Sequence, residues 1–244
     1  MAIALRQSLV VGPTTTNSLQ SPASTSWPQG NPLATSLLVA HVGLTAAQQT
    51  ITVADNVNGS WNQDVYLNTA SLLTGAIFSF TGPSNSSTTV TATIGASAST
   101  RMIIEEWTYD NNWVGSGAGA SLDQTQSKVN TGGSSTPNTN ATGTTAQNIE
   151  LAVEMVIESS THTIAAAGSW NLDITDSTPR LGSAYQLLSS TGTVSGSFTL
   201  GASAAWICCV ATYKTGTAAT TYTLSAQTTA SSQSTTPPSV VYIL

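Results

Sequence analysis

The chain has 244 residues, of which only 7% are charged, and its eleven acidic and five basic side chains give a net charge of −6. Nucleic-acid binding needs clustered lysine and arginine to neutralise phosphates, so this composition argues against a nucleic-acid partner. No apolar run approaches the roughly 18 residues of a spanning helix, so we expect no membrane insertion. Hydrophobic residues make up 40% of the chain, enough for a sizeable folded core.

Short apolar segments with a two-residue period recur along the chain, separated by turns rich in Ser, Gly, Asn or Pro. Alternation of this kind, with many β-branched and aromatic residues, is typical of strands with one buried face. No stretch shows a helical period with caps at both ends. In chain order, the predicted strands cover residues 36–42, 75–80, 88–94, 101–109, 149–158, 195–200 and 205–213.

The segment IELAVEMVIE (149–158) shows the clearest alternation. Its apolar face runs through alternate residues from Ile149 to Ile157. The other face carries three glutamates, Glu150, Glu154 and Glu158. Many short strands of this type predict an all-β fold, a jelly-roll-like antiparallel β-sandwich.

The chain also carries one hexapeptide twice, as GSWNQD from Gly59 and GSWNLD from Gly168. Each copy follows a similar apolar strand and precedes a Gly-Ala-Ser turn that leads into a strand ending in Thr-Tyr. The sandwich is therefore predicted to consist of two sequence-related halves. Four strands with one apolar face cannot close a core alone, so the halves should pack face to face as one domain.

This interpretation divides the chain into a single sandwich domain and two terminal segments. Within the connection between the halves, we expect strand pieces near 122–129 and 141–146 and a flexible tip around 132–137. The predicted parts are an N-terminal arm or first strand (1–32), a sandwich domain (33–213) with halves 33–109 and 148–213 and connection 110–147, and a C-terminal arm (214–244).

Side chains able to support catalysis or metal binding are few and scattered. His41 is expected to be a buried or edge histidine and His162 a turn histidine, so no zinc site is predicted. Glu105 and Glu106 are neighbours in a strand, and they should point to opposite faces rather than flank one glycosidic bond. We therefore expect no catalytic residue, no bound metal and no cofactor. Calcium would be the ion best suited to the four aspartates expected on loops, Asp55, Asp64, Asp173 and Asp176. No dense acidic loop supports a calcium site, however.

The adjacent cysteines Cys208 and Cys209 are expected to be free thiols, one facing a core and the other not. The tryptophans of the repeated hexapeptide, Trp61 and Trp170, are interpreted as structural corners that close the end of a core, with the following Asn and Asp satisfying loop amides. The alternative is that exposed tryptophan rings stack on sugars, as in carbohydrate-binding sandwiches. Coplanar, exposed rings would favour the second interpretation.

Several quoted segments share an organisation with a known group: MAIALRQS at the start, NPLATSLLVAHVGL, the two GSW turns, TRMIIEEWTYDN, SLDQTQSKVNTGG and AAWICCVATYK. The chain resembles the Ser/Thr-rich β-sandwich virion surface proteins of tailed bacteriophages, which include capsid decoration or cement proteins, head fibres and tail appendages. The resemblance covers residues 1–213 and departs from the group at DNNWVGSG, which replaces a glycine-rich turn. It brings no active-site residues.

The resemblance implies a non-enzymatic virion protein on the capsid surface, assembled in the host cytoplasm. Its expected partners are copies of itself, as a homotrimer, and the major capsid protein or another virion protein. The main alternative is a carbohydrate-binding module that contacts a host-surface glycan; an esterase or glycosidase is a third. The apolar chain end SVVYIL is predicted to act as an inter-subunit arm through Val240, Val241, Tyr242, Ile243 and Leu244.

Overall fold

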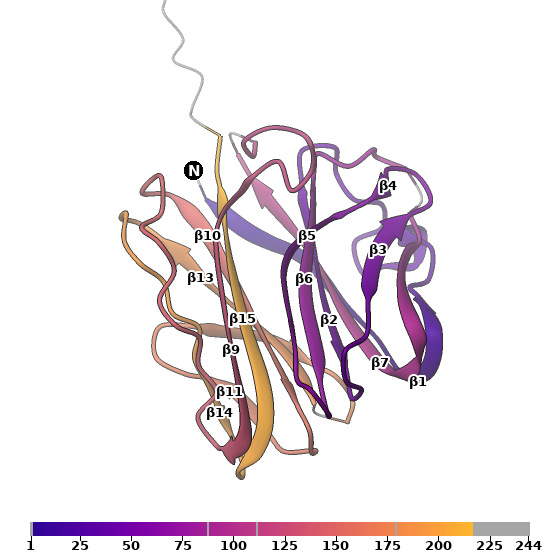
Figure 1. Cartoon of the computed structure of the whole chain (residues 1–244). Coiled ribbons are helices and arrows are strands. Elements are labelled where there is room, and N and C mark those ends of the chain that lie inside the picture. Colours follow the sequence, from indigo (N-terminus) through magenta and orange to yellow (C-terminus); the bar gives the residue numbers. More distant parts are fainter. Residues whose placement is uncertain (1, 87, 111, 179, 217–244) are drawn as a thin grey trace, which may run out of the picture.

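The computed structural model describes residues 2–86, 88–110, 112–178 and 180–216 (Figure 1). Within these residues the chain is almost entirely β, and all the strand pairings are antiparallel, so the all-β sandwich predicted from the sequence is confirmed. The only helical element described is one short 3-10 turn, Ser24–Ser26. No helix in the described residues is long and apolar enough to cross a membrane.

The strands of the first sheet are β1 (Ile3–Gln20), β2 (Leu37–Leu44), β3 (Ile51–Asp55), β4 (Gly59–Ser60), β5 (Asn62–Asn68), β6 (Thr74–Thr81), β7 (Val90–Tyr109) and β8 (Gly117–Ala118). The remaining strands are β9 (Leu122–Ser134), β10 (Glu150–Glu158), β11 (Ile164–Ala166), β12 (Asn171–Thr175), β13 (Leu181–Leu188), β14 (Phe198–Leu200) and β15 (Ala204–Lys214). Five of the second group form the second main sheet, while β11 and β14 pair with each other.

The two main sheets repeat one strand order. The first runs β1-β7-β2-β6-β5, and the second runs β9-β15-β10-β13-β12. Even a local detail recurs. The Gly95 amide donates to the Thr50 carbonyl at 3.0 Å, and the Gly201 amide donates to the Thr163 carbonyl at 2.9 Å. At both glycines an added Cβ would lie 2.5 Å from the threonine hydroxyl, so no larger residue fits without a shift. The halves inferred from the repeated sequence are thus also halves of the fold.

Two of the predicted strands, 88–94 and 101–109, are one continuous strand, β7. Between them, Ala98 pairs with Thr16 of β1 and Thr100 with Thr14, and β7 runs without a break from Val90 to Tyr109. The Gly-Ala-Ser segment of the first half lies within the bounds of β7, so it is strand rather than turn. In the connection, β9 extends to Ser134, beyond the predicted 122–129. Residues 141–146 form no strand, but the Thr142 amide donates to the Val194 carbonyl at 2.8 Å.

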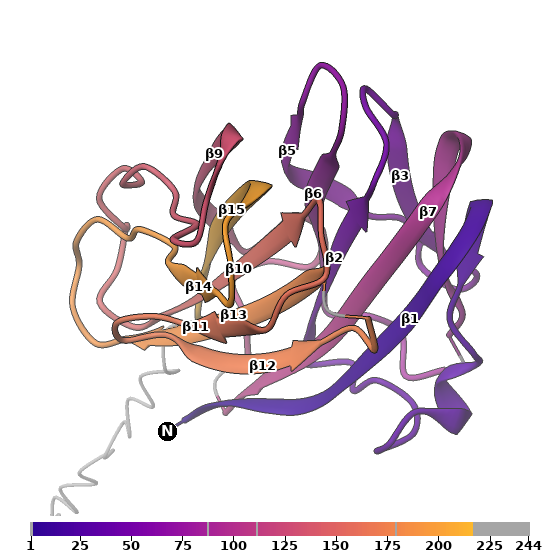
Figure 2. The same ribbon diagram turned by 90° about the horizontal axis from the view of Figure 1, so that it is seen from below.

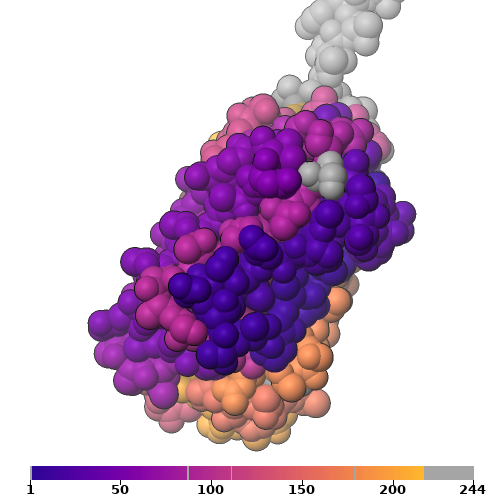
Figure 3. Space-filling view, turned by 90° about the vertical axis from the view of Figure 1, so that its right-hand side faces the viewer, coloured from indigo at the N-terminus to yellow at the C-terminus, as the bar shows by residue number. Residues whose placement is uncertain are grey.

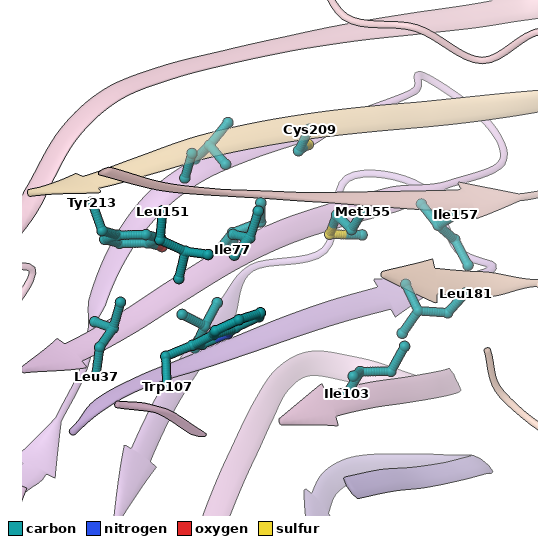
Figure 4. Packing of buried hydrophobic residues seen from close by; sticks show 14 of the residues in the cluster. Leu37, Ile77, Ile103, Trp107, Leu151, Met155, Ile157, Leu181, Cys209 and Tyr213 are labelled. Atoms are coloured by element: carbon teal, nitrogen blue, oxygen red, sulfur yellow. The ribbon is translucent and has the colours of Figure 1, made fainter. Parts of the chain in front are cut away.

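Three apolar cores hold the molecule together. The inner core lies between the two sheets and includes Trp107, Met155 and Tyr213 (Figure 4). A second core lies on the outer face of the first sheet, around Trp61. A third lies on the outer face of the second sheet, around Trp170. Each fully buried large side chain contributes roughly 1.5–3 kcal/mol before entropy costs. Both faces of both sheets are therefore used for packing.

Because both faces of each sheet are covered, two predictions from the sequence are wrong. Glu150, Glu154 and Glu158 are fully buried on their own face, and Ile149, assigned to the apolar face, is exposed instead. Cys208 and Cys209 are also both buried, one in the outer core and one in the inner core. The physical reason is that polar, Ser/Thr-rich segments cover the outer faces. A two-residue period reveals which residues share a face, but not what lies over that face.

Of the two alternatives for the N-terminal segment, an arm or a first strand, the structure shows a first strand within the sandwich. β1 pairs with β7 from Ile3 to Gln20, and Trp27 is buried in the outer core of the first sheet. Figure 3 shows this indigo segment spread over one side of the molecule, beside orange residues of the second half. The body described here therefore begins at Ile3 and not at residue 33. The predicted arm residues from Val240 to Leu244 lie outside the described residues.

Candidate functional site: buried carboxylates and an apolar groove

The tryptophans of the repeated hexapeptide precede β5 and β12, which occupy the same place in the two sheets. Trp61 is 5% exposed and Trp170 is 8% exposed. Trp61 Nε1 donates to Asp55 Oδ2 at 2.8 Å, and Trp170 Nε1 donates to the Ser195 carbonyl at 3.0 Å. Because both rings are covered and their polar atoms are bonded internally, the geometry favours structural corners over sugar stacking.

The aspartates of the same hexapeptide reach from one half of the molecule to the other. Asp64 Oδ2 accepts a hydrogen bond from Tyr213 Oη at 2.6 Å, and Asp173 Oδ1 accepts one from Ser8 Oγ at 3.2 Å. The prediction that they satisfy loop amides is wrong, because both lie in strands and turn inward. Burial raises the pKa of Asp64. Burial, together with the negative charge of Glu105, raises the pKa of Asp173 to about 7.

Glu105 lies in the inner core with His41, on the neighbouring strand. Glu105 Oε1 is 3.1 Å from His41 Nε2, and Glu105 Oε2 accepts a hydrogen bond from Trp107 Nε1 at 2.8 Å. Both carboxylate and imidazole are fully buried. Burial alone would raise the pKa of Glu105, but the attraction of His41 and the hydrogen bonds outweigh it, so the pKa lies below its ordinary value. As predicted, Glu105 and Glu106 point to opposite faces of the sheet.

Four further glutamates, all on outer faces, accept hydrogen bonds from the backbone of the segments that cover the sheets. The acceptor–donor pairs are Glu106 with the Leu33 amide at 2.7 Å, Glu150 with the Gln147 amide at 3.1 Å, Glu154 with the Ser197 amide at 2.6 Å and Glu158 with the His162 amide at 2.8 Å. Such bonds satisfy orphan backbone donors in loops that belong to no strand ladder. These four carboxylates therefore fasten the covering segments to the sheets.

The four differ in how their charge is balanced. Glu106 contacts Arg6 Nη1 at 2.5 Å and also receives hydrogen bonds from Gln7 and Ser36. Burial, with no cation among its contacts, raises the pKa of Glu154 well above its ordinary value. Burial and the negative charge of Asp123 raise the pKa of Glu150 to about 7. Glu154 therefore has a raised pKa and no cation among its contacts in the described residues, whereas Glu106 is part of an ion pair.

The remaining candidate groups also serve the framework. Arg101 Nε donates to Asp176 Oδ2 at 2.7 Å, a buried ion pair that joins the two halves. Asp55 accepts hydrogen bonds from the Val57 and Asn58 amides in the turn after β3. Burial raises the pKa of Cys209 to about 12. The described residues contain no group of three or more His, Cys, Asp or Glu side chains that could hold a metal ion.

One open feature differs from these closed ones: an apolar groove of about 400 Å³ where the start of β1 meets the end of β13. It is lined by Ala2, Ile3, Asn148, Ile149, Leu187, Leu188 and Ser189. Leu187 is 46% exposed and Ile149 is 42% exposed. In Figure 2 the start of β1 lies beside β12 and near β13. Large apolar side chains left open beside one another make this groove a candidate contact surface.

The groove exists because two neighbouring strands differ in length. β12 pairs with β13 only as far as Asn171 opposite Tyr185. The last three residues of β13, from Gln186 to Leu188, therefore pair with β10 on one side and, among the described strands, with none on the other. Sequence reasoning missed this groove. The alternation predicted which residues are apolar, but it carried no signal for where a partner strand stops.

No protein-family model, curated protein or solved structure matches this chain.

Proposed function

We propose that this protein is a non-enzymatic structural component of a tailed-phage virion, and most specifically a capsid decoration protein. It acts through contacts with copies of itself and with the shell. The observation that carries the proposal is the apolar groove, a surface suited to protein contact, at the end of the molecule where β15 also ends. The resemblance of the sequence to virion surface proteins supports a location on the virion.

The interior supports the same proposal. Groups that could take part in chemistry are used to hold the sandwich together: Asp64 and Asp173 join the halves, and Glu106 and Glu154 fasten covering segments. A sandwich with three apolar cores and these internal hydrogen bonds is suited to a protein with a structural role. Sandwich folds also host enzymes and lectins, so the fold alone does not decide the function.

The test is to locate the protein on intact particles. Particles of the virus that encodes this chain would be purified, labelled with an antibody against residues 2–216 and viewed by electron microscopy. We expect gold label over the capsid surface. Label on the tail alone would replace decoration with a tail role, and absence from purified particles would overturn the virion proposal. A glycan-binding screen with the same protein tests the carbohydrate-binding alternative, for which the proposal expects no specific binding.

A further inference from the structure

We propose that the groove between β1 and β13 receives the C-terminal segment SVVYIL (239–244) of a second copy of this chain. The proposal rests on the proposed function in one respect, since it supplies the contact between copies that a decoration protein needs. The groove itself is built from described residues alone.

The chemistry of the groove fits an extended apolar segment. Its lining offers the side chains of Ile3, Ile149 and Leu187, with Asn148 and Ser189 among its polar members. None of the lining residues is charged. The unpaired side of residues 186–188 adds backbone donors and acceptors that a docked strand can use, as in β-strand addition. In the sequence, alternate residues Val240, Tyr242 and Leu244 would face one way in such a strand.

The course of the chain brings its C-terminal end close to the groove. Thr215 Oγ1 donates to the Ile149 carbonyl at 2.7 Å, and Gln147 Nε2 donates to the Thr215 carbonyl at 2.8 Å. The described chain therefore ends beside one wall of the groove. Two prolines precede the apolar segment, which favours an extended approach.

The length of the intervening segment points to a neighbour rather than to the chain's own groove. Only a short loop would be needed to return from Thr215 to the adjacent groove. Residues 217–238 can instead span about 70 Å when extended. A folded chain of this size has a radius of gyration of about 17 Å, so that reach exceeds the width of one sandwich. The segment is long enough to cross a neighbouring copy and reach its groove.

The first measurement is binding of a fluorescein-labelled peptide, TPPSVVYIL, by fluorescence anisotropy. The receptor is the full-length chain with Val240, Tyr242 and Leu244 each changed to Ser, so that its own segment cannot compete. We expect saturable binding that Leu187→Asp weakens about tenfold or more. Leu72→Asp, at a leucine of similar exposure outside the groove, is the matched control and should leave binding unchanged. A peptide that does not bind, or that binds Leu187→Asp equally well, overturns the groove as the acceptor.

The second measurement separates a neighbour's segment from the chain's own. Full-length Leu187→Asp has an intact segment and a blocked groove, and the triple serine variant has the reverse. Each alone should be monomeric by light scattering, and their mixture should form a heterodimer, because one groove and one segment remain compatible. If the peptide binds but wild type is monomeric and the mixture does not associate, the segment belongs in its own groove, and the neighbour proposal fails.

Neither measurement needs a virus particle. Peptide binding and self-association can therefore succeed while antibody labelling finds no protein on the virion, which would overturn the proposed function alone. Labelled capsids together with a peptide that does not bind would overturn the groove alone.

Discussion

The interior of the sandwich and the groove at the end of β13 differ from the usual distribution of residues, because the interior contains acidic side chains and the groove exposes large apolar ones. All five glutamates of the chain lie in the interior with 1% or less of their surface exposed, whereas Leu187 and Ile149 are open to solvent. Acidic residues are rarely buried without partners, and exposed leucines are unremarkable only when they are scattered. The difference shows that the hydrogen bonds of buried carboxyl groups hold this molecule together, while its open apolar surface is available for contact.

The interior itself shows two ways of burying a carboxylate. Glu105 lies beside His41 and has a lowered pKa, while Glu154 has no cation among its contacts and a pKa raised well above its ordinary value. Both are fully buried strand residues in sheets of the same strand order. Substitutions in the interior should therefore change stability according to the partner of each carboxylate. Substitutions in the groove should change assembly instead.

The largest expected effect is on the inner core. His41→Leu keeps a similar volume but leaves Glu105 buried without its neighbouring imidazole, and we expect a loss of about 3–5 kcal/mol in the free energy of unfolding. Chemical denaturation at pH 7 measures it. The double variant His41→Leu with Glu105→Gln should recover much of the loss, because no charge is left uncompensated. If single and double variants are equally unstable, the loss comes from packing and not from the carboxylate.

A matched pair of substitutions compares the two outer faces. Glu106→Gln removes the charge that Arg6 faces and should destabilise the protein by about 2–3 kcal/mol at pH 8. Glu154→Gln replaces a carboxyl group whose pKa burial raises well above its ordinary value by a neutral amide of similar shape, and it should leave stability within about 1 kcal/mol of wild type, or raise it. Both free energies come from urea unfolding. Equal losses at the two positions would contradict the distinction between a glutamate that faces a cation and one that does not.

The pH dependence of stability follows from the raised pKa values. Between pH 4 and 7 the folded protein binds more protons than the unfolded chain at Asp173 and Glu150, so stability should fall as pH rises through this window. We expect the free energy of unfolding to be about 1–3 kcal/mol higher at pH 5 than at pH 8. Glu105 acts in the opposite sense, because its lowered pKa removes stability as the pH falls further. Asp173→Asn should flatten the upper part of the profile; an unchanged profile would rule out Asp173 as a source.

The smallest effect on stability is expected in the groove. Leu187→Asp changes a side chain that is nearly half exposed, so the free energy of unfolding should move by less than about 0.5 kcal/mol. Thermal unfolding at a low protein concentration, where copies do not associate, measures it. A loss of several kcal/mol would place Leu187 in the core of the fold and remove it as a surface probe.

The sequence predicted the strands with the strongest alternation and the duplication, because both depend on local patterns. β2, β6, β10 and β15 lie within two residues of their predicted bounds. A strand after each GSW turn was also predicted, and β5 and β12 lie there, but their mostly polar alternation gave no bounds for them. The buried glutamates could not be foreseen either, because their burial depends on segments far away in the chain, such as the one around Ser197 that covers Glu154.

In the candidate site, too, the features that depend on local patterns could be predicted, and those that depend on tertiary packing could not. The burial of Trp61 and Trp170 agrees with the structural interpretation of a repeated motif, which rested on matched surroundings in the two halves. The inward course of Asp64 and Asp173 depends on which face of β5 and β12 meets the other sheet, and this is a tertiary property. The groove arises from the unequal lengths of β12 and β13, for which the sequence carries no periodic signal.

We propose that the open groove, and not the buried carboxyl groups of the interior, carries the function through contact between copies. The molar mass of full-length Leu187→Asp in solution, measured by light scattering beside wild type, tests it most directly. We expect an oligomeric wild type and a monomeric variant with an unchanged unfolding transition. A variant that keeps the mass of an oligomeric wild type, or a wild type that is itself monomeric, would contradict it.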